Sequence, residues 1–180
     1  MTARSGKLPP LTLVLGGMRS GKSRHAESLV AAAGDLALYI ATAEARDAEM
    51  ADRIRHHQGR RGPAWTTVEA PLDLAGTLRR QGATGHPILV ACLTLWLSNL
   101  MEAGRDPEVE TGTLLAALRE VTAPVVMVSN EVGLGIVPVG ELARRFADAA
   151  GRLNQAVAAR ADRVIFVAAG LPLTLKDVAK

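Results

Sequence analysis

The sequence predicts a single α/β domain in which a mostly parallel sheet carries helices on both faces. Short unbroken apolar segments alternate with helical stretches, a pattern typical of strands that are buried on both sides. A glycine-rich loop ending in Gly21-Lys22-Ser23 joins the first apolar segment to the first helical stretch. The chain of 180 residues suits one compact domain, and its 48% apolar residues are sufficient for a sizeable core.

We expect the short apolar runs to form the strands. They are placed at residues 11–15, 36–40, 65–69, 87–92, 124–129 and 163–168, the last being the final strand expected. The helices are expected between them, at residues 23–33, 44–57, 71–80, 93–103 and 140–161. Residues 1–10 are expected to form a flexible tail, and residues 11–180 the nucleotide-binding domain. Ligands of such folds bind at the carboxyl ends of the strands, so the residues that follow each strand are the candidates for the site.

The composition favours small acidic ligands over nucleic acid. The net charge is +3, and the aromatic residues make up only 3% of the chain, so basic and aromatic residues do not interleave as in a single-strand binder. The longest apolar run, residues 88–97, is too short to span a bilayer, which takes roughly 20 residues. We expect a cytoplasmic protein without membrane insertion. The lone cysteine, Cys92, is expected to be a small buried hydrophobe.

The first loop fits the phosphate-loop motif G-x-x-x-x-G-K-[ST]. Its glycines let backbone N–H groups surround phosphate oxygens, and the following helix adds the positive end of its dipole. Lys22 is expected to reach the β- and γ-phosphates of a nucleotide, and the Ser23 hydroxyl to bind Mg²⁺. The predicted nucleotide-binding residues of the loop are Gly16, Gly17, Met18, Arg19, Ser20, Gly21, Lys22 and Ser23.

A carboxylate is missing from an expected position. Proteins with this loop usually place an acidic residue at the end of another strand, where it helps to hold Mg²⁺. The strand at 87–92 ends in Ala91 and Cys92 instead. Glu131, which follows the strand at 124–129, and Glu69, which ends the strand at 65–69, are the alternative candidates.

Two adjacent histidines stand in the second expected helix. Met50, Ile54 and His57 are spaced to share one helical face, whereas His56 is rotated by about 100° from His57. Neighbouring arginines favour a neutral imidazole at His57, and a neutral imidazole can attack phosphorus. The spacing alone leaves three interpretations of His57 open: a nucleophile, a phosphate contact or a structural histidine. His25 is expected on the surface without a role.

Several stretches together resemble one family, the bifunctional adenosylcobinamide kinase / adenosylcobinamide-phosphate guanylyltransferases of cobalamin biosynthesis. The matching stretches cover most of the chain and lie at residues 16–27, 39–71, 92–100, 129–138, 142–155 and 168–176. The family pattern R-I-x-x-H-x-x-x-R falls on Arg53, Ile54, His57 and Arg61. The resemblance therefore selects His57 over His56 as the nucleophile, and it implies a RecA-like fold and a homotrimer.

The resemblance also implies a reaction in two steps. The enzyme would phosphorylate the aminopropanol hydroxyl of adenosylcobinamide with ATP or GTP. A histidine would then take GMP from GTP, release pyrophosphate and pass the GMP to adenosylcobinamide phosphate, which gives adenosylcobinamide-GDP. Further nucleotide contacts are implied at Ala41, Thr42, Ala43, Gln58, Gly59, Arg60, Arg61 and Glu69. The family carries an acidic residue where this chain has Ala91.

Two other functions fit part of the sequence. A phosphate-loop kinase of another small molecule explains residues 11–33 and leaves His57 without a role. A nucleotide-gated ATPase or switch would suit the absence of an acid at Ala91, but the chain has no basic patch for a nucleic-acid partner.

Overall fold

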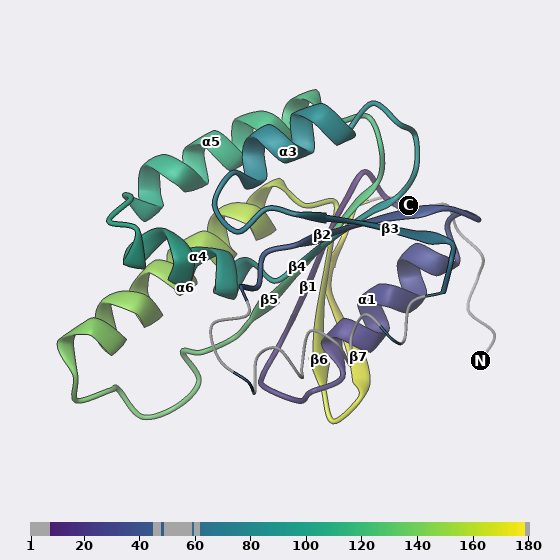
Figure 1. Ribbon diagram of the computed structural model, residues 1–180. Coiled ribbons are helices and arrows are strands. Elements are labelled where there is room, and N and C mark those ends of the chain that lie inside the picture. Colours follow the sequence, from purple (N-terminus) through teal and green to yellow (C-terminus); the bar gives the residue numbers. More distant parts are fainter. Residues whose placement is uncertain (1–7, 45–47, 49–58, 60–61, 179–180) are drawn as a thin grey trace.

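A computed structural model of the chain describes residues 8–44, 48, 59 and 62–178 (Figure 1). Its sheet has seven strands in the order β3-β2-β4-β5-β1-β6-β7, and the antiparallel β7 pairs with β6 at one edge. The strands are β1 (Leu11–Gly16), β2 (Ala37–Ala41), β3 (Trp65–Glu69), β4 (Ile88–Ala91), β5 (Val125–Asn130), β6 (Arg163–Ala168) and β7 (Leu171–Asp177). The mostly parallel α/β sheet predicted from the sequence is confirmed.

Helices cover both faces of this sheet (Figure 1). The described helices are α1 (Lys22–Ala31), α3 (Leu74–Gln81), α4 (Leu93–Glu102), α5 (Pro107–Glu120) and α6 (Glu141–Arg160). The larger apolar core lies between the sheet and the layer of α3 to α6, and the smaller core lies under α1. The parallel strands run in the same direction, so the phosphate loop, the β5–α6 connection and the β6–β7 turn all lie at the carboxyl edge. Within the described ranges, no helix is long and apolar enough to cross a membrane.

Two elements were not predicted from the sequence. Helix α5 starts at Pro107, and the Asp106 side chain caps it by accepting a hydrogen bond from the Glu108 N–H at 2.8 Å. Strand β7 lies at the edge of the sheet. Its leucines alternate with other residues, one of them a proline, so it lacks the unbroken apolar run of a central strand. Its two-residue turn, Ala169-Gly170, has positive φ at both positions, without the Asn-Gly or Asp-Gly pair that usually marks such a turn.

The folded part of the chain extends closer to the N-terminus than predicted. Leu8 is buried in the core under α1, and the Pro10 carbonyl accepts a hydrogen bond from the Val125 N–H at 2.9 Å. Residues 8–10, which the sequence assigned to a flexible tail, therefore belong to the domain. Residues 1–7 lie outside the described part.

Candidate functional site

The phosphate loop connects β1, an interior strand of the sheet, to α1 and depends on two glycines. Gly21 has φ of 97°, and a Cβ there would lie 3.2 Å from the Gly170 Cα. A Cβ at Gly16 would lie 2.5 Å from both the Ser20 Oγ and the Val167 carbonyl oxygen. The Gly170 N–H also donates to the Ser20 carbonyl at 2.8 Å. The β6–β7 turn therefore packs against the loop and supports its shape.

Lys22 lies at the start of α1 with only 8% of its surface exposed. Its Nζ donates a hydrogen bond to the Gly17 carbonyl at 3.1 Å, so the side chain folds back across the loop. Burial lowers the pKa of Lys22, and the nearby Cys92 thiol opposes this effect. A partly desolvated ammonium group is stabilised by an anion, so this position favours the binding of a phosphate.

The start of α1 leaves hydrogen-bonding capacity for such an anion. Gly21 is the N-cap and supplies no side-chain cap, and the first turn contains no acidic residue. The first N–H groups of a helix have no intrahelical acceptor, so they can donate to phosphate oxygens. The Ser20 Oγ is buried and has no hydrogen-bond partner in the structure. The geometry therefore supports the predicted phosphate loop.

The side chains near the phosphate loop suit a magnesium ion that binds together with a nucleotide. Among the residues that the structure describes, no group of three or more His, Cys, Asp or Glu side chains could hold a metal ion. Ser23 lies in the first turn of α1 and can supply one hydroxyl oxygen. Mg²⁺ commonly takes only one or two protein ligands and completes its shell with phosphate oxygens and water. The residues present fit that arrangement.

At the carboxyl end of β4, hydrogen bonds within the protein occupy the backbone polar groups of Cys92. The Cys92 N–H donates to the Thr42 Oγ1 at 2.6 Å, and the Thr42 hydroxyl donates to the Cys92 carbonyl at 2.8 Å. The Asn130 amide lies 3.7 Å from the Cys92 Sγ. Cys92 is half-buried at this polar junction, so the prediction of a simple buried hydrophobe is wrong. Its neighbours are supplied by distant segments, which the local apolar run did not reveal.

Glu131 lies close to the phosphate loop, but its carboxylate contacts its own loop. Its N–H donates to the Gly16 carbonyl at 3.1 Å, directly beside the end of β1. Its Oε1 accepts a hydrogen bond from the Gly133 N–H at 2.6 Å. An ionised carboxylate has a second oxygen, so this bond is compatible with the role in holding a metal that was predicted from the sequence.

The ends of β2 and β3 bring together a second group of predicted residues. Ala41 pairs with Glu69 in the sheet register, and the Glu69 side chain is exposed at the edge strand. The completely buried Thr42 lies between the half-buried Ala41 and Ala43. Strand β2 is three strands away from β1, which corresponds to about 14 Å. The predicted nucleotide contacts therefore fall into two separate groups.

Asn99 was not predicted from the sequence as a site residue. Its side chain holds the segments of the second group in place by hydrogen bonds. The side chain is 6% exposed in α4, and its Nδ2 donates to the Thr42 carbonyl at 2.7 Å and to the Pro71 carbonyl at 3.0 Å. It therefore joins the residues that follow β2 and β3. The available signal was the one amide side chain in the mostly apolar helix of residues 93–102.

The nucleophile candidate lies outside the described residues. The structure does not describe His57, His56, Gln58, Arg60 or Arg61. It does describe Gly59, which is exposed. The segment that contains them follows Glu44, just beyond the carboxyl end of β2.

His25 does not lie freely on the surface as predicted. It is half-buried in α1, and its Nε2 is buried without a hydrogen-bond partner in the structure. Burial lowers the pKa of the imidazole, which favours its neutral form.

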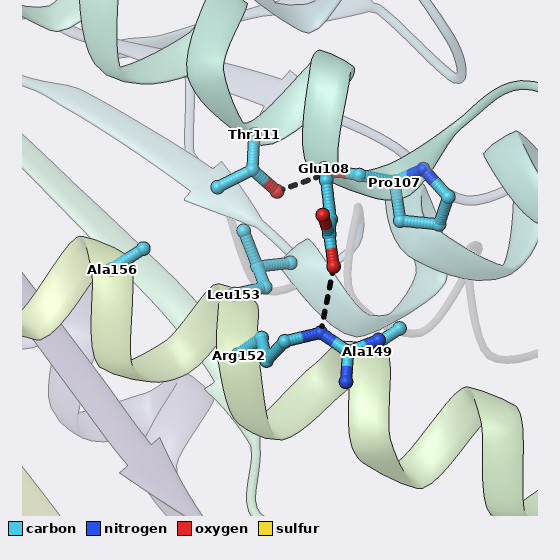
Figure 2. Close-up of a pocket in the computed structure, with 7 residues that line it drawn as sticks. All are labelled: Pro107, Glu108, Thr111, Ala149, Arg152, Leu153 and Ala156. Atoms are coloured by element: carbon cyan, nitrogen blue, oxygen red, sulfur yellow. Dashed lines mark hydrogen bonds and ion pairs between the residues drawn. The ribbon is translucent and has the colours of Figure 1, made fainter.

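A pocket between α5 and α6 lies apart from these strand ends (Figure 2). Its apolar floor includes Leu153, and the Arg152 Nε lies 3.2 Å from the Glu108 Oε1. Both charged side chains are largely exposed. Among the residues that the structure describes, none at a strand end lines the pocket, so we assign it no part in the site.

Comparison with known proteins supplies the family. The sequence family described as cobinamide kinase / cobinamide phosphate guanyltransferase matches residues 12–175. The chain belongs to this family. A bifunctional adenosylcobalamin biosynthesis protein, CobP of Pseudomonas aeruginosa, is 53% identical over 91% of this chain and 96% of its own length. The corresponding protein CobU of Salmonella typhimurium is 43% identical over 92% of this chain and 99% of its own length.

Solved structures place this family member in the RecA-like fold. The flagellar accessory protein FlaH from Methanocaldococcus jannaschii has a TM-score of 0.55 at 14% identity, with 96% of this chain and 80% of that chain covered. An ATPase of a bacterial type III secretion system has a TM-score of 0.53 at 12% identity, with coverage of 94% and 59%. The predicted RecA-like phosphate-loop fold is confirmed.

Proposed function

We propose that the chain phosphorylates adenosylcobinamide and then converts the product to adenosylcobinamide-GDP with GMP taken from GTP. Membership of the cobinamide kinase / cobinamide phosphate guanyltransferase family gives the two activities. The observation that carries the mechanism is the phosphate loop, in which Lys22 is buried and the start of α1 is uncapped. This end of the sheet is suited to the phosphates of a nucleotide.

In the kinase step, the phosphate loop binds the β- and γ-phosphates of ATP or GTP. The aminopropanol hydroxyl oxygen attacks the γ-phosphorus, the bond to the β-phosphate oxygen breaks, and the hydroxyl proton is released. Lys22 neutralises charge on the phosphates as the leaving nucleoside diphosphate, ADP or GDP, forms. Ser23 would hold Mg²⁺, and the ion would neutralise part of the charge of the phosphates. Glu131 remains a second candidate to hold the ion.

In the transfer step, an imidazole nitrogen of His57 attacks the α-phosphorus of GTP. The bond to pyrophosphate breaks, and a histidine-GMP intermediate forms. A phosphate oxygen of adenosylcobinamide phosphate then attacks the same phosphorus and regenerates His57. The guanine nucleotide would be held by Ala41, Thr42, Ala43, Gln58, Gly59, Arg60, Arg61 and Glu69.

We further propose that the protein acts in the cytoplasm as a homotrimer. The exposed edge strand β7 supports an assembly, because Leu171, Leu173 and Leu175 alternate along it and are 73%, 60% and 58% exposed. An edge strand with exposed leucines is a surface that proteins usually cover. Light scattering would give the mass of the assembly.

A covalent-labelling experiment tests the proposed mechanism. The protein is incubated with Mg²⁺ and GTP that carries a radiolabel on either the α- or the γ-phosphate. We expect only the α-label to stay on the denatured protein, to be released by acid and to survive alkali. The label should disappear in His57→Ala and remain in the matched control His56→Ala.

The same experiment separates the proposal from the two other functions. A kinase of another small molecule or a nucleotide-gated ATPase would leave no α-label on the protein. Labelling that survives in His57→Ala would show that another residue is the nucleophile. Phosphorylation of adenosylcobinamide, measured with the γ-label, tests the kinase step independently.

A further inference from the structure

The connection between β5 and α6 exposes an unusual number of apolar side chains. We call residues 131–142 the apolar loop. The exposed fractions are 39% for Val132, 80% for Leu134, 98% for Ile136, 73% for Val137, 96% for Val139 and 69% for Leu142. Residues 132–140 contain no charged side chain. Exposed apolar side chains grouped in one segment in this way mark a place where a protein binds another molecule.

Side-chain hydrogen bonds hold the backbone of the apolar loop at both ends. The Glu131 carboxylate accepts from the Gly133 N–H at 2.6 Å. The Arg144 guanidinium donates to the Pro138 carbonyl at 3.1 Å and also to the Val139 carbonyl. The loop is therefore fastened to the domain while its apolar side chains remain exposed. Such pre-organisation lowers the entropic cost of binding a ligand.

The apolar loop begins at the phosphate loop. The Glu131 N–H donates to the Gly16 carbonyl at 3.1 Å, and β5 pairs directly with β1. Figure 1 shows the β5–α6 connection and the phosphate loop at the same edge of the sheet. An acceptor whose hydroxyl approaches the γ-phosphate would extend past this edge.

We propose that the apolar loop is the subsite that binds the corrin ring of the acceptor. This inference rests on the proposed function, which supplies a corrinoid acceptor. The ring has broad apolar faces, its rim carries neutral amides, and a flexible aminopropanol arm bears the hydroxyl that reacts. The apolar side chains of residues 132–140, a stretch without charged residues beside the phosphate loop, match the ring face. The arm then joins the bound ring to the phosphate loop.

The test measures binding of the corrinoid and of the nucleotide separately. The double variant Ile136→Ser/Val139→Ser removes apolar surface from two almost fully exposed positions, so the fold should tolerate it. The matched control is Val109→Ser, at a position on α5 that is 63% exposed. We expect the Kd for adenosylcobinamide, measured by calorimetry, to rise about tenfold or more in the double variant. The Kd for GTP with Mg²⁺ should stay unchanged, and the control should resemble wild type in both.

Three other results would overturn the inference. An unchanged corrinoid Kd in the double variant, with wild type binding normally, would refute the subsite and leave the proposed function intact. An unchanged Kd together with a smaller mass in light scattering would show that the loop covers a contact between copies of the chain. A wild-type protein that binds GTP and does not bind adenosylcobinamide would refute the proposed acceptor, and this inference with it.

Discussion

The carboxyl ends of β1 and β4 occupy equivalent places in the same parallel sheet, yet they differ in chemistry. After β1, the buried Ser20 Oγ has no hydrogen-bond partner among the described residues, and the start of α1 has no side-chain cap. After β4, the backbone N–H and carbonyl of Cys92 are both bonded to the Thr42 hydroxyl. The comparison teaches that a strand end becomes a ligand site when its polar groups lack protein partners. When distant side chains satisfy them, the same position becomes a structural joint.

The largest expected effect comes from removing the cation at the end of β1. Lys22→Ala should reduce the rate of γ-phosphate transfer by about a hundredfold or more, because the phosphates lose their nearest buried positive charge. Turnover is measured with adenosylcobinamide and γ-labelled ATP. Lys176→Ala is the control, since the Lys176 Nζ contacts the Ala158 and Ala159 carbonyls at the end of α6. Equal rates in the two variants would show that the end of β1 is not where the phosphates bind.

The next effect, on stability and not on rate, is expected from opening the joint beyond β2 and β4. Asn99→Ala removes the donor to the Thr42 and Pro71 carbonyls. Each buried carbonyl left without a partner costs about 1–3 kcal/mol, so the loss of both hydrogen bonds should lower the free energy of unfolding by roughly 2–6 kcal/mol. Urea unfolding followed by circular dichroism measures it.

The neighbouring Ser98→Ala serves as the matched control. Its hydroxyl donates to the exposed Glu102 carboxylate at 3.3 Å, so the unfolding free energy should change by less than about 0.5 kcal/mol. If Asn99→Ala proved equally mild, the end of β4 would not be the structural joint described above.

The smallest expected effect comes from making the end of β4 resemble a metal-binding strand end. Ala91→Asp places a carboxylate on the half-buried last residue of β4, two strands from β1. The Mg²⁺ concentration for half-maximal kinase rate should fall about threefold, because an acid at such a strand end helps to hold the ion. Ala91→Asn is the uncharged control of similar shape. An identical Mg²⁺ requirement in both variants would mean that this position does not support the metal.

The sequence predicted local features well and the contacts between distant segments poorly. The phosphate loop is contiguous, so the spacing of its glycines and Lys22 was enough to predict it. The polar joint depends on Thr42, Cys92 and Asn99, which come from different elements and meet only in the folded chain. Strand β7 was missed because its stability comes from pairing with β6 at the sheet edge, while its own residues alternate and remain largely exposed.

The contact between Gly170 and the phosphate loop has a consequence for truncated chains. A chain ending after β6 would keep every residue of the G-x-x-x-x-G-K-[ST] motif. It would lose the N–H that donates to the Ser20 carbonyl and the backbone that packs against Gly21. The motif occupies eight consecutive residues, but Gly170, which packs against it, lies about 150 positions later in the sequence. An intact signature in a shortened homologue would therefore not be enough to infer an intact phosphate site.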